Sequence, residues 1–270
     1  MENDFPQALT IAGSDSDGSA GMEADLHSFF KRKVYGLVVL TAAVAGNSYG
    51  VFNRCNLPED FIQAEFKNLA ADFKIRAAKT GMLADAPLIS LVAKEYQKYD
   101  LGPLVVDPVI VSKHGAILMD DPGIDMLRSK LLPLATILTP NFKEAERLTE
   151  MDIKDDSMII KAASKLRSWG AKNIMLKGSH AFDSQQKVVR DYVLLEDGSS
   201  FWIENSYIDT KRINGTGDTL SAIITAELAK GENIRQAIMT ANENTHRALA
   251  DSILVGHKYG PINHWKIKEN

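Results

Sequence analysis

The chain is organised around one stretch, Ile213-Asn214-Gly215-Thr216-Gly217-Asp218-Thr219-Leu220-Ser221-Ala222. Two glycines bracket a threonine, and a helical apolar pattern begins directly after them. Glycine lets the backbone turn tightly and approach a ligand closely. The first turn of a helix presents unpaired N–H groups at the positive end of the helix dipole. The stretch therefore predicts a site for an anion, most often a phosphate.

Asp218 is unexpected at such a site, because a carboxylate repels an anion unless it has a chemical task there. General base is the task we expect, since a carboxylate can take the proton from a hydroxyl as that hydroxyl attacks a phosphoryl group. The same residues also suit a purely structural role. An Asn-Gly turn before Thr-Gly-Asp-Thr can cap a helix, with Asp218 in its first turn. The rest of the chain decides between the two interpretations.

The composition favours one large α/β domain, which we expect to span residues 1–270. The chain is 45% hydrophobic and has a formal net charge of −4 at pH 7, so nothing indicates a nucleic acid or an anionic membrane as partner. Cys55 is the only cysteine, which excludes an intramolecular disulfide and fits a reducing compartment. We find no signal-peptide core and no apolar run of membrane-spanning length, and we expect a cytoplasmic protein.

Predicted strands alternate with predicted helices along most of the chain. Apolar and β-branched runs predict strands at 9–12, 37–45, 104–109, 135–138 and 174–178. Helical spacing of apolar residues predicts helices at 20–30, 58–73, 87–99, 124–132, 159–169 and 234–249. A turn at 196–198 between 188–195 and 200–204 predicts a β-hairpin. The alternation favours an α/β fold with a mostly parallel sheet and helices on both faces.

Two aspartates lie where the strands of such a sheet end. Asp25 follows Gly21 by one helical turn and can point into a cleft there, although a solvated helix face is the alternative. Asp107 stands directly before Pro108 at a strand end, and open α/β sheets bind ligands at the carboxyl ends of their strands. Asp107 is thus a candidate contact for a metal–phosphate or a substrate hydroxyl, with a turn aspartate as the alternative.

Three further polar residues are candidates for phosphate or metal binding. Asn141 and Glu144 are three residues apart at a helix start, so they can order the water shell of Mg²⁺, which keeps several waters when bound. The same pair nearly forms a capping box, which is the structural alternative. Lys177 ends a strand beside Gly178, a suitable place for a phosphate contact or for a solvated lysine.

Other site classes lack their motifs. There is no Gly-x-Gly-x-x-Gly after the first strand and no Gly-x-x-x-x-Gly-Lys-Ser/Thr, so dinucleotide-binding and P-loop interpretations lose their main support. The six histidines and one cysteine show no zinc spacing, and Gly-x-Ser-x-Gly is absent. The glycine-containing segment 111–118 is a candidate lid over a site.

Taken together, the motifs make the chain similar to a known family. They are 10–16, 20–26, Lys79-Thr80-Gly81-Met82-Leu83, Val106-Asp107-Pro108-Val109, Leu132-Pro133, Thr139-Pro140-Asn141, Asn214-Gly215-Thr216-Gly217 and Gly260-Pro261-Ile262-Asn263-His264. With these segments, spread over essentially its whole length, the chain resembles the ribokinase-like superfamily. Within it, the chain resembles the vitamin kinase branch, which contains the hydroxymethylpyrimidine/phosphomethylpyrimidine kinases of thiamin biosynthesis and the similar pyridoxal kinases of vitamin B6 salvage.

The resemblance implies a kinase that uses ATP and Mg²⁺, phosphorylates a hydroxymethyl group on a heteroaromatic ring and tends to form a homodimer. The implied substrate-binding residues are Gly13, Asp25, Gly46, Met82 and Val109. The implied ATP-binding residues are Asp107, Asn141, Lys177 and Asn214. Mg²⁺ would be held, partly through water, by Asp107, Asn141 and Glu144. The transferring phosphoryl group would meet the backbone amides of Gly215, Thr216, Gly217 and Asp218. Lys113 and His114 are implied lid contacts.

The chain departs from the branch at two positions. Asp218 stands where the branch commonly has cysteine, and aspartate is the general base of the sugar-kinase relatives, which makes a sugar kinase a third interpretation. Gly46 stands where the pyrimidine kinases usually have glutamine, whose amide can pair with the pyrimidine edge. Losing such a contact favours pyridoxal or pyridoxine, with hydroxymethylpyrimidine, or both, as the alternative. A non-catalytic ATP- or vitamin-binding sensor predicts a broken catalytic set, and here the set is present.

Overall fold

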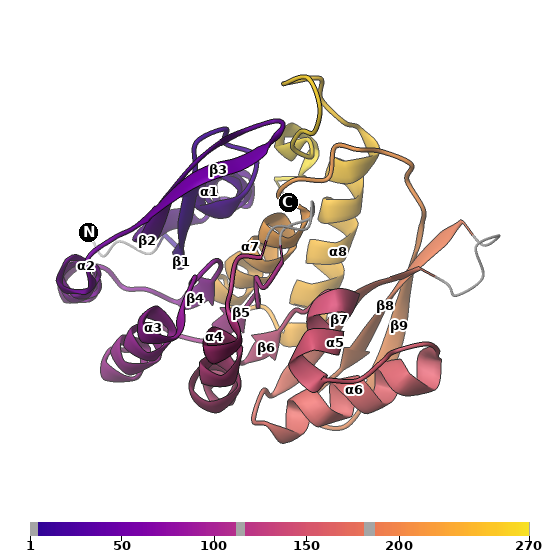
Figure 1. Ribbon diagram of the computed structural model, residues 1–270, viewed down its shortest axis with the longest axis horizontal. Helices are drawn as coiled ribbons and strands as arrows, with labels where there is room; N and C mark the ends of the chain where they lie inside the picture. Colours follow the sequence, from indigo (N-terminus) through magenta and orange to yellow (C-terminus); the bar gives the residue numbers. More distant parts are fainter. Residues whose placement is uncertain (1–4, 112–116, 181–186, 270) are drawn as a thin grey trace.

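A mixed sheet runs through the computed structural model, which describes residues 5–111, 117–180 and 187–269 (Figure 1). Its nine strands in these ranges follow the order β3-β2-β1-β4-β5-β6-β7-β8-β9. The strands are β1 Gln7–Asp15, β2 Tyr35–Asn47, β3 Gly50–Asn56, β4 Ala77–Thr80, β5 Leu104–Val106, β6 Ile137–Leu138, β7 Asn173–His180, β8 Val188–Leu194 and β9 Ser200–Ser206. The pairs from β2-β1 through to β6-β7 are parallel, and β3, β8 and β9 add antiparallel pairs at the two margins. The mostly parallel sheet and the hairpin β8-β9 confirm the predictions.

Helices cover both faces of this sheet, as predicted. They are α1 Gly21–Lys31, α2 Glu59–Asp72, α3 Ala86–Lys98, α4 Asp121–Met126, α5 Phe142–Thr149, α6 Asp156–Ser168, α7 Thr216–Ala229 and α8 Ile234–Ala250. In β5, Leu104 and Val106 pack in the larger core with residues of α2 to α6, whereas Val105 packs with α7 and α8. Figure 1 shows that α7 and α8 lie side by side. Among the helices in the described ranges, none is long and apolar enough to cross a membrane.

Two elements differ from the sequence predictions. Strand β3 was not among the predicted strands; it follows β2 through a tight turn and pairs with it antiparallel. Most side chains of β3 are exposed, so the strand carries no buried apolar run that a pattern could reveal. The helix expected at 124–132 is divided: α4 ends at Met126, a π turn spans Leu127–Leu131, and a 3-10 turn at Leu132–Leu134 contains Pro133, which lacks the N–H that an α-helix needs.

Candidate active site

The turn before α7 is built on glycine. Gly215 precedes the helix with φ 77°, and a Cβ there would lie 2.3 Å from the carbonyl oxygen of Ser19. A larger residue would therefore face both the left-handed conformation and a backbone collision. The Thr216 N–H donates to the carbonyl of Ile213 at 3.3 Å, so its expected contact with the phosphoryl group stays a prediction. The amides of Gly217 and Asp218, in the first turn of α7, have no partner within the helix.

The Asp218 carboxylate is held next to this turn from several sides. It accepts a hydrogen bond from the backbone N–H of Gly21, at the start of α1. Burial raises the pKa of Asp218, and Asp107 raises it further, while the positive charges of Lys79 and Lys177 oppose the rise. A carboxylate with a raised pKa is a better proton acceptor than an ordinary aspartate, which is what a general base requires.

Asp107 is the point where three elements meet. It is 5% exposed, and its Oδ1 lies 3.4 Å from Lys177 Nζ in β7. The hydroxyl of Ser221 in α7 lies 3.5 Å from its Oδ2, and the hydroxyl of Thr139 lies 3.5 Å from Oδ1. A turn aspartate would bond its own loop, whereas Asp107 faces α7 and β7. The Lys177 side chain is 14% exposed, so the solvated-lysine alternative is wrong.

Gly217 leaves open a space between these two charged residues. A Cβ at Gly217 would lie 3.2 Å from Asp107 Oδ2 and 3.6 Å from Lys177 Nζ. The helix start, the carboxylate and the ammonium therefore converge on one small region. This arrangement places amide donors and a cation where a phosphate can approach.

Asn141 and Glu144 form a complete capping box at the start of α5. Asn141 Oδ1 accepts from the Glu144 N–H at 3.0 Å, and Glu144 Oε2 accepts from the Asn141 N–H at 2.8 Å. The structural alternative is thus correct, and it is compatible with a second role of these residues in metal binding. Burial raises the pKa of Glu144 to about 7, Asp107 raises it as well, and Lys177 lowers it. The pKa of the buried Glu144 carboxyl therefore depends on the charges of Asp107 and Lys177.

A buried polar cluster lies behind the turn. Asp25 and Lys79 are both fully buried and form an ion pair, and Thr10 Oγ1 donates to Asp25 Oδ2 at 2.6 Å. Thr10 and Lys79 are direct neighbours in the β1-β4 register. Burial raises the pKa of Asp25 to about 7, and Lys79 opposes this. The solvated alternative for Asp25 is therefore wrong.

Sequence reasoning assigned no role to Lys79, although a signal was present. Lys79 lies in the run Ala77-Ala78-Lys79-Thr80, a short strand in which every residue is buried. A buried charge is costly unless it is paired, so a lysine in such a strand predicts a carboxylate partner. Burial lowers its pKa, but the charges of Asp25, Asp218 and Asp107 outweigh this and the net pKa is raised.

The other expected substrate-binding residues are distributed along this edge of the sheet. Gly13 lies against Met82, since a Cβ on Gly13 would be 2.7 Å from Met82 Cε. Gly46 in the β2-β3 hairpin exchanges two hydrogen bonds with the hydroxyl of Ser16, at 2.9 and 3.0 Å. The Val109 N–H donates to the Asp107 carbonyl at 2.9 Å. The lid residues Lys113 and His114 lie outside the described residues, so their role stays a prediction.

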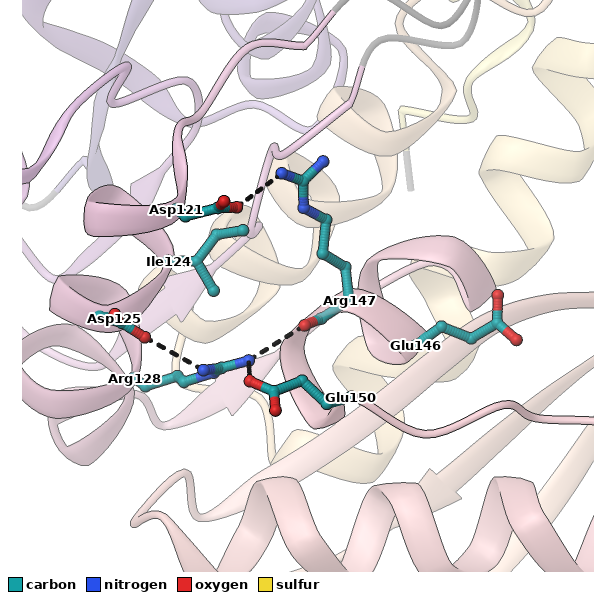
Figure 2. A pocket seen from close by; sticks show the side chains of 7 residues that line it. All are labelled: Asp121, Ile124, Asp125, Arg128, Glu146, Arg147 and Glu150. Carbon is teal, nitrogen blue, oxygen red and sulfur yellow. Dashed lines mark hydrogen bonds and ion pairs between the residues drawn. The ribbon is translucent and has the colours of Figure 1, made fainter.

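A surface pocket elsewhere in the molecule has a different character. It lies between α4 and α5, and Figure 2 shows Arg128 and Arg147 pointing toward acidic side chains. Arg147 pairs with Asp121 at 2.8 Å, and Arg128 pairs with Glu150 at 2.9 Å. The arginines there form ion pairs, and none of the lining residues belongs to the region around Asp107, Lys177 and Asp218.

Comparison with known proteins identifies the family. Residues 15–263 match the sequence model of the phosphomethylpyrimidine kinases. The chain belongs to this family. It is a kinase, a phosphotransferase with an alcohol group as acceptor, and the vitamin-kinase resemblance of its motifs is confirmed. The sugar-kinase interpretation suggested by Asp218 is not supported.

Individual relatives represent both substrate classes of the branch. A hydroxymethylpyrimidine/phosphomethylpyrimidine kinase of Haemophilus influenzae is 44% identical over 96% of each chain. An ADP complex of Bacillus subtilis pyridoxal kinase has a TM-score of 0.88 and 35% identity, and the match covers 97% of this kinase and 98% of that chain. A phosphomethylpyrimidine kinase of Clostridium difficile has a TM-score of 0.75 and 34% identity, over 87% and 95%. The fold and the expectation of ATP binding agree with these neighbours.

Proposed function

We propose that residues 1–270 form one kinase domain that transfers the γ-phosphoryl group of ATP to the hydroxymethyl group of a heteroaromatic ring. Hydroxymethylpyrimidine or its monophosphate is the first substrate candidate. The observation that carries the reaction is the convergence of Asp218, Asp107 and Lys177 on the glycine turn before α7. The identity of the ring is supported by the sequence relatives, which are named as pyrimidine kinases.

In this proposal each residue has a defined task. Asp218 accepts the proton of the substrate hydroxyl, and its raised pKa suits that step. The amides of Gly217 and Asp218 stabilise the negative charge that spreads over the transferring phosphoryl group. Lys177 contacts the phosphates of ATP. Phosphoryl transfer depends mainly on positioning and charge stabilisation, and these groups provide both.

The residues around Asp107 fit Mg²⁺. Kinases usually hold this ion through one or two carboxylates, substrate phosphates and several waters. Asp107 and Glu144 are two buried carboxyls. Burial raises the pKa of Glu144 to about 7 and the charge of Asp107 adds to the rise, and a cation relieves such repulsion. Within the described ranges, no three His, Cys, Asp or Glu side chains gather into a metal cage. We expect Asp107, Glu144 and Asn141 to hold the ion partly through water, where it would neutralise phosphate charge.

A pyridoxal-type ring is the second candidate, and Gly46 is the residue that suggested it. The structure also provides a local explanation for the presence of glycine at position 46. A Cβ at Gly46 would lie 2.8 Å from the carbonyl oxygen of Gly50 across the hairpin. Glycine at this position therefore lets the β2-β3 hairpin close, whatever the substrate is. Gly46 alone therefore does not favour pyridoxal over a pyrimidine, and pyridoxal stays the second candidate.

ADP release with ATP and Mg²⁺ tests the reaction and the ring together. The panel contains hydroxymethylpyrimidine, its monophosphate, pyridoxal, pyridoxine and ribose, compared by kcat/KM. We expect the highest value for a pyrimidine. A preference for the pyridines would show that Gly46 does mark the substrate. Binding of ATP without turnover of any compound would contradict the proposed activity and support a sensor.

Replacing Lys177 by methionine tests the phosphate contact. We expect kcat/KM for ATP to fall by about 10- to 100-fold, because a hydrogen bond to a charged group contributes about 1.5–3 kcal/mol and each 1.4 kcal/mol is about tenfold. Lys172→Met is the matched control, since Lys172 is an exposed lysine paired loosely with Glu196 at 3.6 Å. Equal kcat/KM in both variants would remove Lys177 from the ATP site.

We also propose that the kinase forms a homodimer, as the resemblance implies. The exposed hairpin around Tyr49, Val51 and Phe52 supports this, since these side chains are 54%, 48% and 70% exposed at the edge of the sheet. Exposed apolar edges favour association. Light scattering should give twice the mass of the chain for the unmodified kinase and a monomer for Phe52→Asp. A monomer in both would contradict the proposal.

A further inference from the structure

The closing segment Gly260–His264 lies along the glycine turn that opens α7. Asn214 and Pro261 form a parallel bridge. The N–H of Asn214 donates to the carbonyl of Gly260 at 3.1 Å, and the N–H of Ile262 donates to the carbonyl of Asn214 at 3.2 Å. The segment was part of the family resemblance, yet the reaction described above gives it no task. Asn214, which makes these contacts, directly precedes Gly215, the first glycine of the turn.

The same segment also contacts the other side of the turn. His264 Nε2 lies 2.8 Å from the hydroxyl of Thr219, the residue directly after Asp218. Thr219 is completely buried. Burial lowers the pKa of His264 to about 4, and the neighbouring His27, whose ring centroid is 5.2 Å away, lowers it too. The imidazole is therefore neutral near pH 7 and has one donor and one acceptor nitrogen with which to pair a hydroxyl.

The segment is itself anchored to rigid parts of the fold. The Asn263 N–H donates to the carbonyl of Ala248 in α8 at 2.8 Å. Ile262 is fully buried in the core that contains Ile223 and Ile238. The contacts to Asn214 and Thr219 are thus held against α7 and α8 together. A support of this kind fixes the position of whatever lies between its two ends.

We propose that Gly260–His264 is a clasp that fixes the backbone amides of the glycine turn in the position that the transferring phosphoryl group requires. His264 is a positioning residue in this clasp and acts through Thr219. The inference rests on the proposed function. The turn depends on Gly215 and Gly217, which have no side chains to pack, so its geometry has to be held by its neighbours. Donors of this type stabilise charge only when they are preorganised, and a displacement of about 1 Å can cost about 10²-fold in rate.

Activity of matched variants tests the clasp. His264→Ala is expected to lower kcat by about 10- to 100-fold with little change in KM for ATP. His264→Gln, whose amide can reach the position of Nε2, should restore most of kcat. Thr219→Val should resemble His264→Ala, and the double variant should be no worse than either, because both remove one contact. His246→Ala is the control: its Nε2 makes a similar contact with Ser206, at 3.3 Å, between α8 and β9.

Hydrogen exchange of peptides that cover 213–219 provides a readout independent of turnover. His264→Ala should exchange faster there, and His246→Ala should not. Unchanged exchange, or a kcat per folded protein equal to that of the unmodified kinase, would overturn the clasp. Losses that multiply in the double variant would overturn the pairing of His264 with Thr219. If the unmodified kinase turned over no substrate while exchange still responded to His264, the proposed function would fail and the clasp would stand.

Discussion

Asp218→Asn is expected to lower kcat by about 10²- to 10⁴-fold while ATP still binds, because this is the usual contribution of a general base. The amide keeps the shape of the side chain and the hydrogen bond from the Gly21 N–H, so the change removes mainly the proton acceptor. The positive charges of Lys79 and Lys177 lose a partner, but Asp25 and Asp107 remain beside them. Single-turnover kinetics measure the loss in the chemical step, and calorimetry measures whether ATP still binds.

The pH profile gives the same assignment a second test. A base works only when it is ionised, so activity falls on the acid side as Asp218 takes up a proton. Burial raises the pKa of Asp218 above its ordinary 3.8, and the acid limb of kcat/KM should therefore lie above the range of an ordinary aspartate.

Asp156→Asn is the matched control, because Asp156 also lies in the first turn of a helix but pairs with Arg190 at 2.7 Å. We expect it to keep full activity. Near-normal turnover of Asp218→Asn would contradict the assignment of Asp218 as the general base.

Lys79→Met should have the largest effect on stability. It leaves the fully buried Asp25 without its counter-charge, and breaking a buried ion pair from one side typically costs about 3–5 kcal/mol. Chemical denaturation measures the loss. Lys268→Met is the control, since both side chains of its pair with Glu243 at 2.6 Å are exposed, by 48% and 57%. An exposed pair contributes only about 0–1 kcal/mol, so equal losses in the two variants would contradict the role of the buried pair.

The same substitution should shift the pH dependence of the enzyme that remains folded. The positive charge of Lys79 lowers the pKa of Asp218, so its removal raises that pKa and moves the acid limb of kcat/KM to higher pH. A double variant with Asp25→Leu should recover part of the stability, because it removes the stranded carboxyl. An unmoved acid limb in the folded Lys79→Met enzyme would show that the two groups do not interact.

The main features of the site followed from local sequence because each depends on short spacings. Gly215 and Gly217 before an apolar helix pattern predicted an anion site at a helix start, and the structure shows that start beside Asp107 and Lys177. Asp107 was found because parallel strands end at one edge of a sheet. The capping box of Asn141 and Glu144 could be predicted from the sequence because both partners lie within one turn of helix.

Other features were out of reach because they depend on residues far apart in the chain. The partner of Lys79 lies 54 positions away, on α1 rather than on a neighbouring strand. The contact between Thr219 and His264 spans 45 positions. The exposed strand β3 has no buried face and so produced no pattern. Only the packing of the helices on the sheet brings such pairs together.

The sequence by itself therefore determined the alternation of strands and helices, the glycine turn and the carboxylates at the strand ends. These depend on hydrophobic periodicity and on the conformational freedom of glycine, which act over a few residues. The tertiary structure alone decided which charges face each other, how burial shifts the pKa values of Asp25, Glu144 and Asp218, and that the closing segment holds the turn. Those properties arise from desolvation and Coulomb interactions across the core, which depend on distance in space and not on distance along the chain.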